Sequence, residues 1–295
     1  MKDNGLLVQY FNANTPADQT LWAKAAKDAV TLKKIGATAV WFPPATKGAA
    51  GKEDMGYAPY DLYDLGEFNQ KGSVGTRYGT KKEYLEAIDA MKAQGINVYA
   101  DIAVRQKLGA DSVEKVTAAD FNAKDIPQMI GNKKIVGALS KFTFAGRRSK
   151  YSKFKWNWNH FAGIDWQQDD FKKRVCELSG MTEEEAEKKY KLSKYDYIIG
   201  SELDLYNQEV YDELMTWAKW YEDVTGVDGF RFQEAEKVPG WFIRDFAEAA
   251  SNAGEEEKEI FTVGDFWHWR CDYINDYIAS ADNQPSMFDV PLHFS

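Results

Sequence analysis

Apolar residues recur along this chain with two alternating periods. From residue 21 to 35, and again from 80 to 93, they return every three to four positions, as on the buried face of a helix. These helical positions are Leu21, Ala25, Ala29 and Leu32 in the first stretch and Tyr84, Leu85, Ile88 and Met91 in the second. Each stretch leads into a short apolar run, at 37–44 and 96–101, typical of a buried strand. The alternation predicts parallel strands joined by helices.

The same alternation returns in the second half of the chain. The further expected elements are helices at 210–221 and 241–250 and strands at 5–11, 227–232, 261–267 and 287–294. Between about Lys107 and Ser201 the alternation gives way to a stretch rich in Lys, Trp and Tyr that is too long for an ordinary loop. Within it, Thr182 and the three glutamates that follow are typical of a capped, acidic first turn of a helix. We therefore expect an inserted domain between the third and fourth strands.

Composition places the chain among globular proteins. Its 295 residues, 44% of them hydrophobic and 15% aromatic, can bury a large core and fit one barrel-sized domain with an insertion. The formal net charge of −9 argues against nucleic acid or an anionic membrane as a partner, because either needs a basic patch. A neutral polymer is compatible with this charge.

The N-terminus and the cysteines bear on the compartment. Residues 1–4 show neither the charged region nor the apolar stretch of a secretory leader, and no apolar run approaches the ~18 residues of a membrane-spanning helix. These patterns predict a cytoplasmic protein. Cys176 and Cys271 lie far apart and are expected to be free thiols. The three histidines show no metal-binding spacing and are expected to serve in packing: His160, His268 and His293.

One short motif indicates the chemistry. Residues 227–233 are V-D-G-F-R-F-Q, and the alternation of side chains along a strand places Arg231 and Gln233 on one face. The run resembles the G-F-R-x-D motif of the α-amylase family (glycoside hydrolase family 13), whose last Asp is the nucleophile. Here that position is Gln233. A retaining glycosidase needs an ionised carboxylate and a second carboxyl group ~5–5.5 Å apart, and an amide cannot replace the first.

The resemblance runs from Gly5 to the C-terminus and is closest to the bacterial liquefying-type α-amylases. Besides the motif, six segments are similar to family segments in the family's order: 5–11, 37–44, 56–68, 96–101, 261–267 and 287–294. The resemblance implies an α/β fold, a (β/α)8 TIM barrel of which about six of eight β/α units are present. It assigns 1–106 to barrel strands 1–3, 107–201 to the inserted domain B and 202–295 to strands 4–6. Strands 7 and 8 and the C-terminal β-domain are expected to be absent, and with them the family's third catalytic Asp.

The positions that match catalytic residues depart from the family pattern. Asp265 falls where the family has its Glu acid/base, and its side chain is shorter by one methylene. Arg231 matches the arginine that clamps the nucleophile, and Asp101 matches a supporting residue at the end of the third strand. Glu234 could supply the missing carboxylate only if a bulge turned it, because the pleat otherwise points it to the opposite face. No catalytic residue is therefore predicted to be functional.

The resemblance also indicates where a sugar would bind. Tyr57 lies in the segment that shapes the inner sugar subsite, and Tyr57 and Trp267 are expected to stack on sugar rings. Gln106 stands in place of a His that hydrogen-bonds the sugar. Glu236 and Lys237 stand in place of a Lys-His pair that contacts the reducing-side sugars. Together these changes alter the donors and the charge of the subsite.

The positions of the family's structural calcium are changed as well. Arg105 takes the place of a ligating Asn, and Glu202 and Ala162 take the places of ligating Asp residues. Calcium needs six to eight oxygen ligands, and a guanidinium supplies none and repels the ion. The resemblance therefore implies a lost calcium site and no cofactor. Arg105 is expected to pair with Glu202 or, failing that, with Asp204.

Three functions stay open at this point. The first is a non-catalytic family member that binds or senses α-glucan or acts as a scaffold. The second is an active α-glucan hydrolase or transglycosylase that uses Asp265 with Glu234 or Glu236. The third is an assembly protein without sugar binding. In each case a second copy or another protein is expected to cover the open barrel edge, formed by the strands that contain Val8, Tyr10, Val290 and Leu292.

Overall fold

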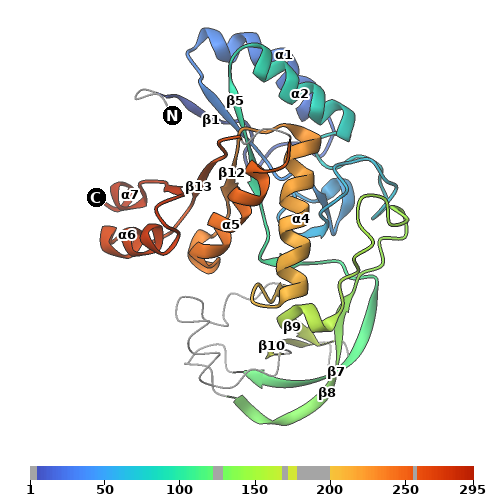
Figure 1. The fold of residues 1–295 in the computed structure, drawn as a ribbon. Helices are drawn as coiled ribbons and strands as arrows, with labels where there is room; N and C mark the ends of the chain where they lie inside the picture. The colour runs from blue at the N-terminus through green and yellow to red at the C-terminus, as the bar shows by residue number, and fades with distance from the viewer. Residues whose placement is uncertain (1–4, 122–128, 168–171, 178–199, 255–257) are drawn as a thin grey trace.

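Six parallel strands form the main sheet (Figure 1). In hydrogen-bonded order they are β1 (Leu7–Gln9), β2 (Ala39–Phe42), β5 (Asn97–Ile102), β12 (Gly229–Phe232), β13 (Phe261–Gly264) and β14 (Ser286–Met287). The computed structural model describes residues 5–121, 129–167, 172–177, 200–254 and 258–295. The sheet curls as part of a (β/α) barrel, which confirms the fold type expected from the sequence.

Helices connect the strands and pack against the outer face of the sheet (Figure 1). They are α1 (Leu21–Lys34), α2 (Lys81–Ala93), α4 (Gln208–Thr225), α5 (Gly240–Ser251) and α6 (Cys271–Ser280), and a further short helix, α7 (Val290–Phe294), follows the last strand. A capping box begins α2, where the Thr80 backbone N–H donates to Glu83 and the Glu83 N–H donates to the Thr80 hydroxyl. Within the described ranges, no helix is long and apolar enough to span a bilayer.

Aromatic side chains fill the layer between helices and sheet. The ring of Trp22 on α1 lies 4.7 Å from that of Tyr84 on α2 and 5.3 Å from that of Phe42 on β2. Tyr84 and Tyr221 on α4 join their hydroxyls at 2.8 Å inside the core, so neither buried hydroxyl is left without a partner. These contacts fix α1, α2 and α4 on the sheet, and thereby place the strand ends.

A second, antiparallel sheet lies beyond the carboxyl ends of the barrel strands (Figure 1). Its strands, in order, are β10 (Lys172–Glu177), β7 (Ser112–Phe121), β8 (Met129–Lys141), β9 (Phe161–Gln167), β11 (Ser201–Leu203) and β6 (Gln106–Lys107). A short pair, β3 (Lys47–Gly48) and β4 (Pro59–Asp61), and the 3-10 turns η1 (Gly51–Glu53), η2 (Trp158–His160) and η4 (Ala235–Lys237) complete the described elements. This sheet lies in the expected insertion, and the exact domain boundaries stay predictions.

The sixth expected strand is shorter than the sequence pattern predicts. Only Ser286–Met287 pairs with β13, and residues Val290–Phe294 form the helix α7. Asp289 caps this helix by accepting a hydrogen bond from the Leu292 N–H at 3.1 Å, and a proline lies in its first turn. The assignment of Val290 and Leu292 to an edge strand was therefore wrong. The expected helical turn after Thr182 lies outside the described residues.

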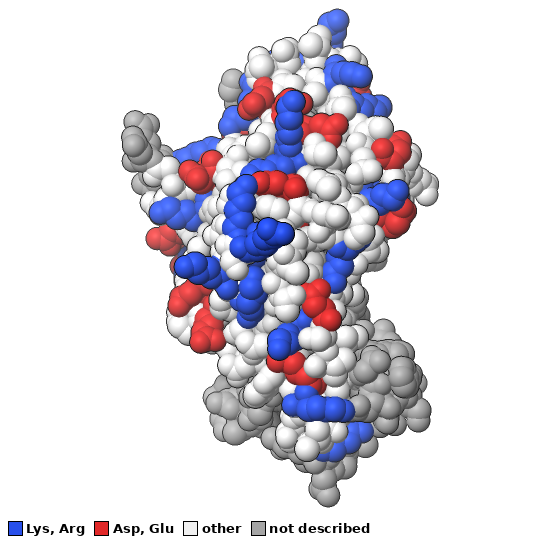
Figure 2. Space-filling model, turned by 90° about the vertical axis from the view of Figure 1, so that its right-hand side faces the viewer, with Lys and Arg blue, Asp and Glu red and all other residues white. Residues whose placement is uncertain are grey.

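Charges of both signs share the surface. Figure 2 shows Lys and Arg side chains lying among Asp and Glu side chains on one face of the molecule. One cation is instead fully buried. The Lys47 ammonium donates to the backbone carbonyls of Ser73 at 2.8 Å and Val74 at 2.6 Å, and lies 3.5 Å from the buried Asp64 carboxylate. Burial raises the pKa of Asp64, and Lys47 opposes that shift. Lys47 thus holds the loop between β4 and α2 against the barrel.

Removing this ammonium should destabilise the protein strongly. Lys47→Met leaves the Asp64 charge and two carbonyls buried without their cation, and breaking such a pair costs about 3–5 kcal/mol. The exposed Lys52→Met serves as the control and should change stability by less than about 0.5 kcal/mol. Urea unfolding followed by circular dichroism measures both. Equal midpoints for the two variants would contradict the assigned role of Lys47.

Candidate functional site

Three charged side chains meet where the barrel strands end. Asp101 on β5 and Arg231 on β12 are register partners in adjacent strands, and Asp265 directly follows β13. Arg231 Nη1 lies 2.9 Å from both carboxylate oxygens of Asp101, and Arg231 Nη2 donates to Asp265 Oδ2 at 2.5 Å. A single buried guanidinium therefore bridges two carboxylates that come from strands on either side of it.

Asp101 is fully enclosed. Besides Arg231, it accepts a hydrogen bond from the Tyr57 hydroxyl at 2.6 Å and one from Trp41 Nε1 at 3.1 Å. Burial raises the pKa of Asp101, and the Arg231 charge and these donors oppose the shift. Every oxygen of this carboxylate is thus satisfied by protein groups, and Asp101 acts as an anchor for Arg231.

Asp265 has a different environment because it lies at the mouth of the barrel. Its Oδ1 accepts from the Glu234 backbone N–H at 2.6 Å, and its Oδ2 accepts from Trp267 Nε1 at 3.3 Å in addition to Arg231. Burial raises the pKa of Asp265, and Arg231 opposes this shift. Three donors therefore hold one carboxylate beside the exposed indole of Trp267.

The chain turns sharply after β12. Gln233 is half-buried and its backbone N–H donates to the Ile102 carbonyl at 3.2 Å, while Glu234 takes a left-handed conformation with φ of 49°. The strand pleat ends before Glu234, so the expectation that the pleat points this side chain away from the site does not hold. Among the described residues, the side-chain hydrogen bonds of Arg231 go to Asp101 and Asp265.

Glu234 lies between two cations. Its Oε2 is 3.1 Å from Arg105 Nη2 and its Oε1 accepts from Lys237 at 2.5 Å. Arg105 is buried, and its Nη1 also lies 3.9 Å from Glu202 Oε1 on β11. The expected pair with Glu202 is therefore present at long range, and the shorter contact is with Glu234.

This donor set does not fit the calcium that the family resemblance implies. A guanidinium occupies the space between the carboxylates of Glu202 and Glu234, and Ala162 on β9 offers a methyl group where an oxygen ligand would be needed. Over the described ranges, no group of three or more His, Cys, Asp and Glu side chains is arranged to hold a metal ion.

The remaining predicted site residues surround the same strand ends. Gln106 is buried and uses its Nε2 to donate to the Tyr57 carbonyl at 3.1 Å, so it positions Tyr57. Lys237 and Glu236 lie on η4, and Trp267 is 56% exposed. Burial raises the pKa of Glu236, whose Oε2 has no hydrogen-bond partner within the described structure. Of these groups, Trp267 is the exposed one, and the Lys237 side chain is nearly buried and pairs with Glu234.

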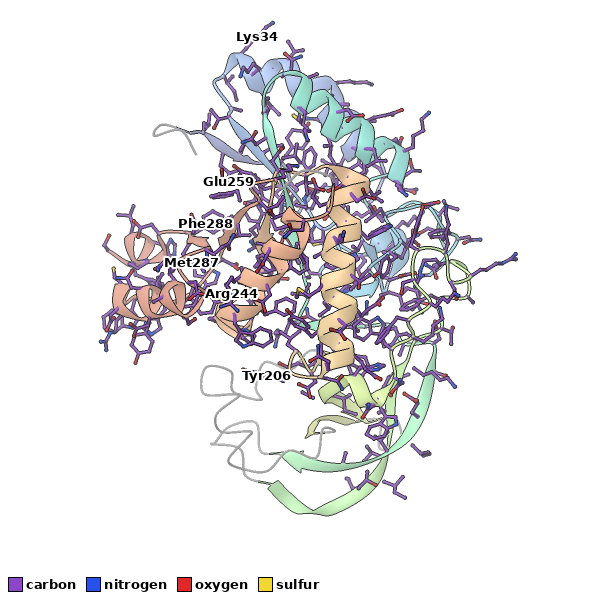
Figure 3. The ribbon with its side chains drawn as sticks, viewed as in Figure 1. Lys34, Tyr206, Arg244, Glu259, Met287 and Phe288 are labelled. Carbon is purple, nitrogen blue, oxygen red and sulfur yellow. The ribbon has the colours of Figure 1, made fainter. Side chains whose placement is uncertain are left out.

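Two aromatic residues of the site were missed by the sequence reasoning. Arg231 stacks over the Trp41 ring at 4.6 Å, and the Trp41 ring lies 5.7 Å from that of Phe288. Figure 3, which labels Phe288 and Met287, shows both beside α7. Trp41 lies in the expected second strand, and its place near the carboxyl end was a signal that could have been used. Phe288 lies within the strand expected at 287–294, and in the structure it directly follows the two-residue β14.

Two of the three histidines adjoin the site: the His293 ring lies 5.8 Å from that of Trp267, and His268 follows Trp267 in the chain. His160 is buried, packs between Phe154 and Trp156 and pairs with Glu209 at 3.1 Å. His268 stacks on a neighbouring tyrosine ring. Cys271 is an exposed free thiol, and the side chain of Cys176 lies outside the described part.

Sequence comparison finds relatives that align with this chain over nearly its whole length. No family model matches. The chain is 42% identical over 292 residues to an alpha-amylase of Geobacillus stearothermophilus, covering 98% of this chain and 52% of that protein. It is 38% identical over 294 residues to a glucan 1,4-alpha-maltohexaosidase of Bacillus sp. strain 707, covering 99% and 56%. It is 35% identical over 298 residues to a cytoplasmic alpha-amylase of Escherichia coli K12, covering 98% and 59%. The chain thus spans about half the length of the curated relatives it matches.

Solved structures agree on the fold. An alpha-amylase from Anoxybacillus aligns with a TM-score of 0.57 at 17% identity, covering 97% of this chain and 51% of that one. An alpha-amylase from Geobacillus thermoleovorans, solved with acarbose, aligns with a TM-score of 0.55, covering 98% and 51%. The strand order, the second sheet after the third barrel strand and the sequence identity over nearly the whole chain lead to one conclusion: the chain belongs to the α-amylase family, glycoside hydrolase family 13.

Proposed function

We propose that this protein binds α-1,4-glucan at the strand ends without hydrolysing it. The observation that carries the proposal is the position of Arg231, whose guanidinium is committed to Asp101 and Asp265 while an amide, Gln233, stands at the family's nucleophile position. An amide cannot form the covalent glycosyl intermediate of a retaining mechanism.

The environment of Asp265 supports the same view. Its two oxygens accept hydrogen bonds from Arg231, Trp267 and the Glu234 backbone, and all three donors favour the charged form. A general acid must instead carry a proton and direct it at the leaving oxygen. Held in this way, Asp265 is an acceptor for sugar hydroxyls rather than a proton donor.

The groups around Asp265 suit sugar recognition. Trp267 exposes its indole beside the Asp265 carboxylate, and the partly exposed Glu234 carboxylate lies on the adjacent turn. Sugar rings have apolar faces edged by hydroxyls, so they match one aromatic surface bordered by hydrogen-bonding groups. The proposed ligand is therefore a short stretch of neutral α-glucan.

A second candidate, an active α-glucan hydrolase or transglycosylase, is favoured by one observation. Glu236 has a buried carboxyl whose Oε2 is without a hydrogen-bond partner among the described groups, and burial raises the pKa of Glu236. Burial raises the pKa of Asp265 too, and a raised pKa is the direction that a general acid needs. Asp265 with Glu236, or with Glu234, would then replace the family pair.

The assay that separates the two candidates is product release from soluble starch. We expect no maltooligosaccharide release above a no-enzyme blank, because loss of a covalent nucleophile removes most of the rate enhancement. Chromatographic product analysis over hours, at pH 5 to 8, measures it. Release that Glu236→Gln or Asp265→Asn abolishes would overturn the first candidate in favour of the second.

Arg105 is proposed to replace the calcium of the family. Its guanidinium joins Glu202 and Glu234 without metal. The melting temperature should therefore be the same in buffer and in 5 mM EDTA, a chelator excess of about a thousandfold over micromolar protein. Arg105→Met should lower the melting temperature by several degrees, because two acidic groups lose their cation. A fall in melting temperature on chelation of the unchanged protein would contradict this replacement.

The edges of the main sheet are proposed to receive another polypeptide, either a second copy or a different protein. Within the described sheet, β1 and β14 each pair with one strand only, and Val8 and Tyr10 on the β1 side are partly exposed. Light scattering from micromolar to hundred-micromolar protein should show association. A monomer at every concentration and in cell extract would refute the proposal.

A cytoplasmic location is also proposed, supported by the likeness to the cytoplasmic alpha-amylase of Escherichia coli.

A further inference from the structure

A group of exposed aromatic rings lies next to the site, on the segment that joins β13 to α6. Trp269 is 66% exposed and Tyr273 is 44% exposed, although rings of this size are ordinarily much more buried. Both follow Trp267 closely in the chain, and Trp267 is itself 56% exposed. Three large rings within seven residues therefore face solvent in one short segment.

The outer rings are held in a stack. The His268 ring is nearly parallel to both: its centroid lies 6.0 Å from that of Trp269 at 15° and 4.3 Å from that of Tyr273 at 20°. The Arg270 guanidinium lies 4.9 Å from the Tyr273 ring centroid and 5.9 Å from that of Trp269. We define His268, Trp269 and Tyr273 as the aromatic stack.

Local hydrogen bonds fix the orientation of the stack. The Arg270 backbone N–H donates to His268 Nδ1 at 3.1 Å, and Arg270 Nε donates to Asp272 at 2.9 Å. At its base, the buried Phe266 packs on Tyr277 of α6 at 5.2 Å. The rings are thus ordered before any ligand arrives, which lowers the entropic cost of binding on them.

The aromatic stack is continuous with the candidate site. Trp267 links the two, because its Nε1 donates to Asp265 while its neighbour in sequence, His268, is part of the stack. If one sugar ring of a polymer lies against Trp267, the aromatic stack is the neighbouring surface for the rest of the polymer, because both belong to the same chain segment. A single sugar at Asp265 would not extend beyond Trp267.

We propose that the aromatic stack is an additional sugar-binding subsite, in which Trp269 and Tyr273 support the continuation of an α-glucan chain that lies over Asp265 and Trp267. This inference rests on the proposed function and adds to it a preference for longer chains. The ligand class is a linear α-1,4-linked glucan of more units than the central site can hold.

The polarity around the rings favours this ligand over a protein surface. Exposed polar residues surround the aromatic stack: Arg270, Asp272, Asn275 and Asp276. A protein partner would bury a continuous apolar patch with few charges at its centre. The exposed Trp269 ring, bordered by charged and amide groups, instead matches the apolar face and hydroxyl rim of a sugar ring.

Calorimetric titration with two maltooligosaccharides tests the proposal. The unchanged protein should bind maltoheptaose more tightly than maltotriose. Trp269→Ala should weaken maltoheptaose binding by about three- to tenfold, the scale of one lost aromatic contact, and leave maltotriose binding unchanged. Trp269→Phe should retain most of the affinity for maltoheptaose, since it keeps a flat ring.

Trp158→Ala is the matched control, because this tryptophan is 40% exposed and lies on η2, in the insertion rather than beside Asp265. Its affinities should equal those of the unchanged protein. If Trp269→Ala leaves the ratio of the two affinities unchanged, the subsite is refuted and the proposed function stands. If neither sugar binds the unchanged protein, the proposed function is refuted, and the additional subsite that rests on it is refuted as well. A change of mass in light scattering for Trp269→Ala or Tyr273→Ala, without a change in sugar affinity, would assign the stack to a protein interface and overturn the proposal.

Discussion

The buried guanidinium of Arg231 determines how the strand ends of this barrel are organised. It stands between Asp101 on β5 and Asp265 after β13, so that one cation compensates two carboxylates from the strands that flank its own. An unpaired charge at this depth would cost several kcal/mol, so neither carboxylate could be buried here without it. The hydrogen bonds from Trp41 and Tyr57 to Asp101 complete the arrangement. The position of Asp265, and with it that of Trp267, follows from this one interaction.

A second buried guanidinium repeats the principle at the junction of the barrel and the inserted sheet. Arg105 follows β5 and contacts carboxylates from β11 and from the turn after β12. Arginine suits this position because its planar group offers several donors and stays charged at any physiological pH. The same contact holds Glu234 in its left-handed turn, close to the backbone bond that orients Asp265.

The elements that were predicted well share one property, a hydrophobic period long enough to be specific. The helix expected at 21–35 and the strand expected at 96–101 correspond to α1 and β5 to within a residue or two, because each buries a continuous apolar face. The strand expected at 287–294 failed because Asp289 and the following proline favour a helix start, and that local preference prevails where only two residues pair with β13. The family motifs indicated where the candidate site lies, but could not give the partners of its side chains.

What the sequence determined by itself, through its resemblance to the family and its hydrophobic periods, was therefore the barrel type, the order of its strands and the inserted region. Those features depend on local periodicity and on residue types at fixed spacing, and both are properties of the linear chain. The tertiary structure decided which charges pair. Arg105 lies closer to Glu234 than to Glu202, and Arg231 joins Asp265. These partners are far apart in the sequence and meet only when the strands align, since Glu202 is 97 positions and Glu234 129 positions from Arg105, and Asp265 is 34 positions from Arg231. The exposure of Trp269 and Tyr273 was also decided there, since burial depends on what the rest of the fold covers and not on the ring itself.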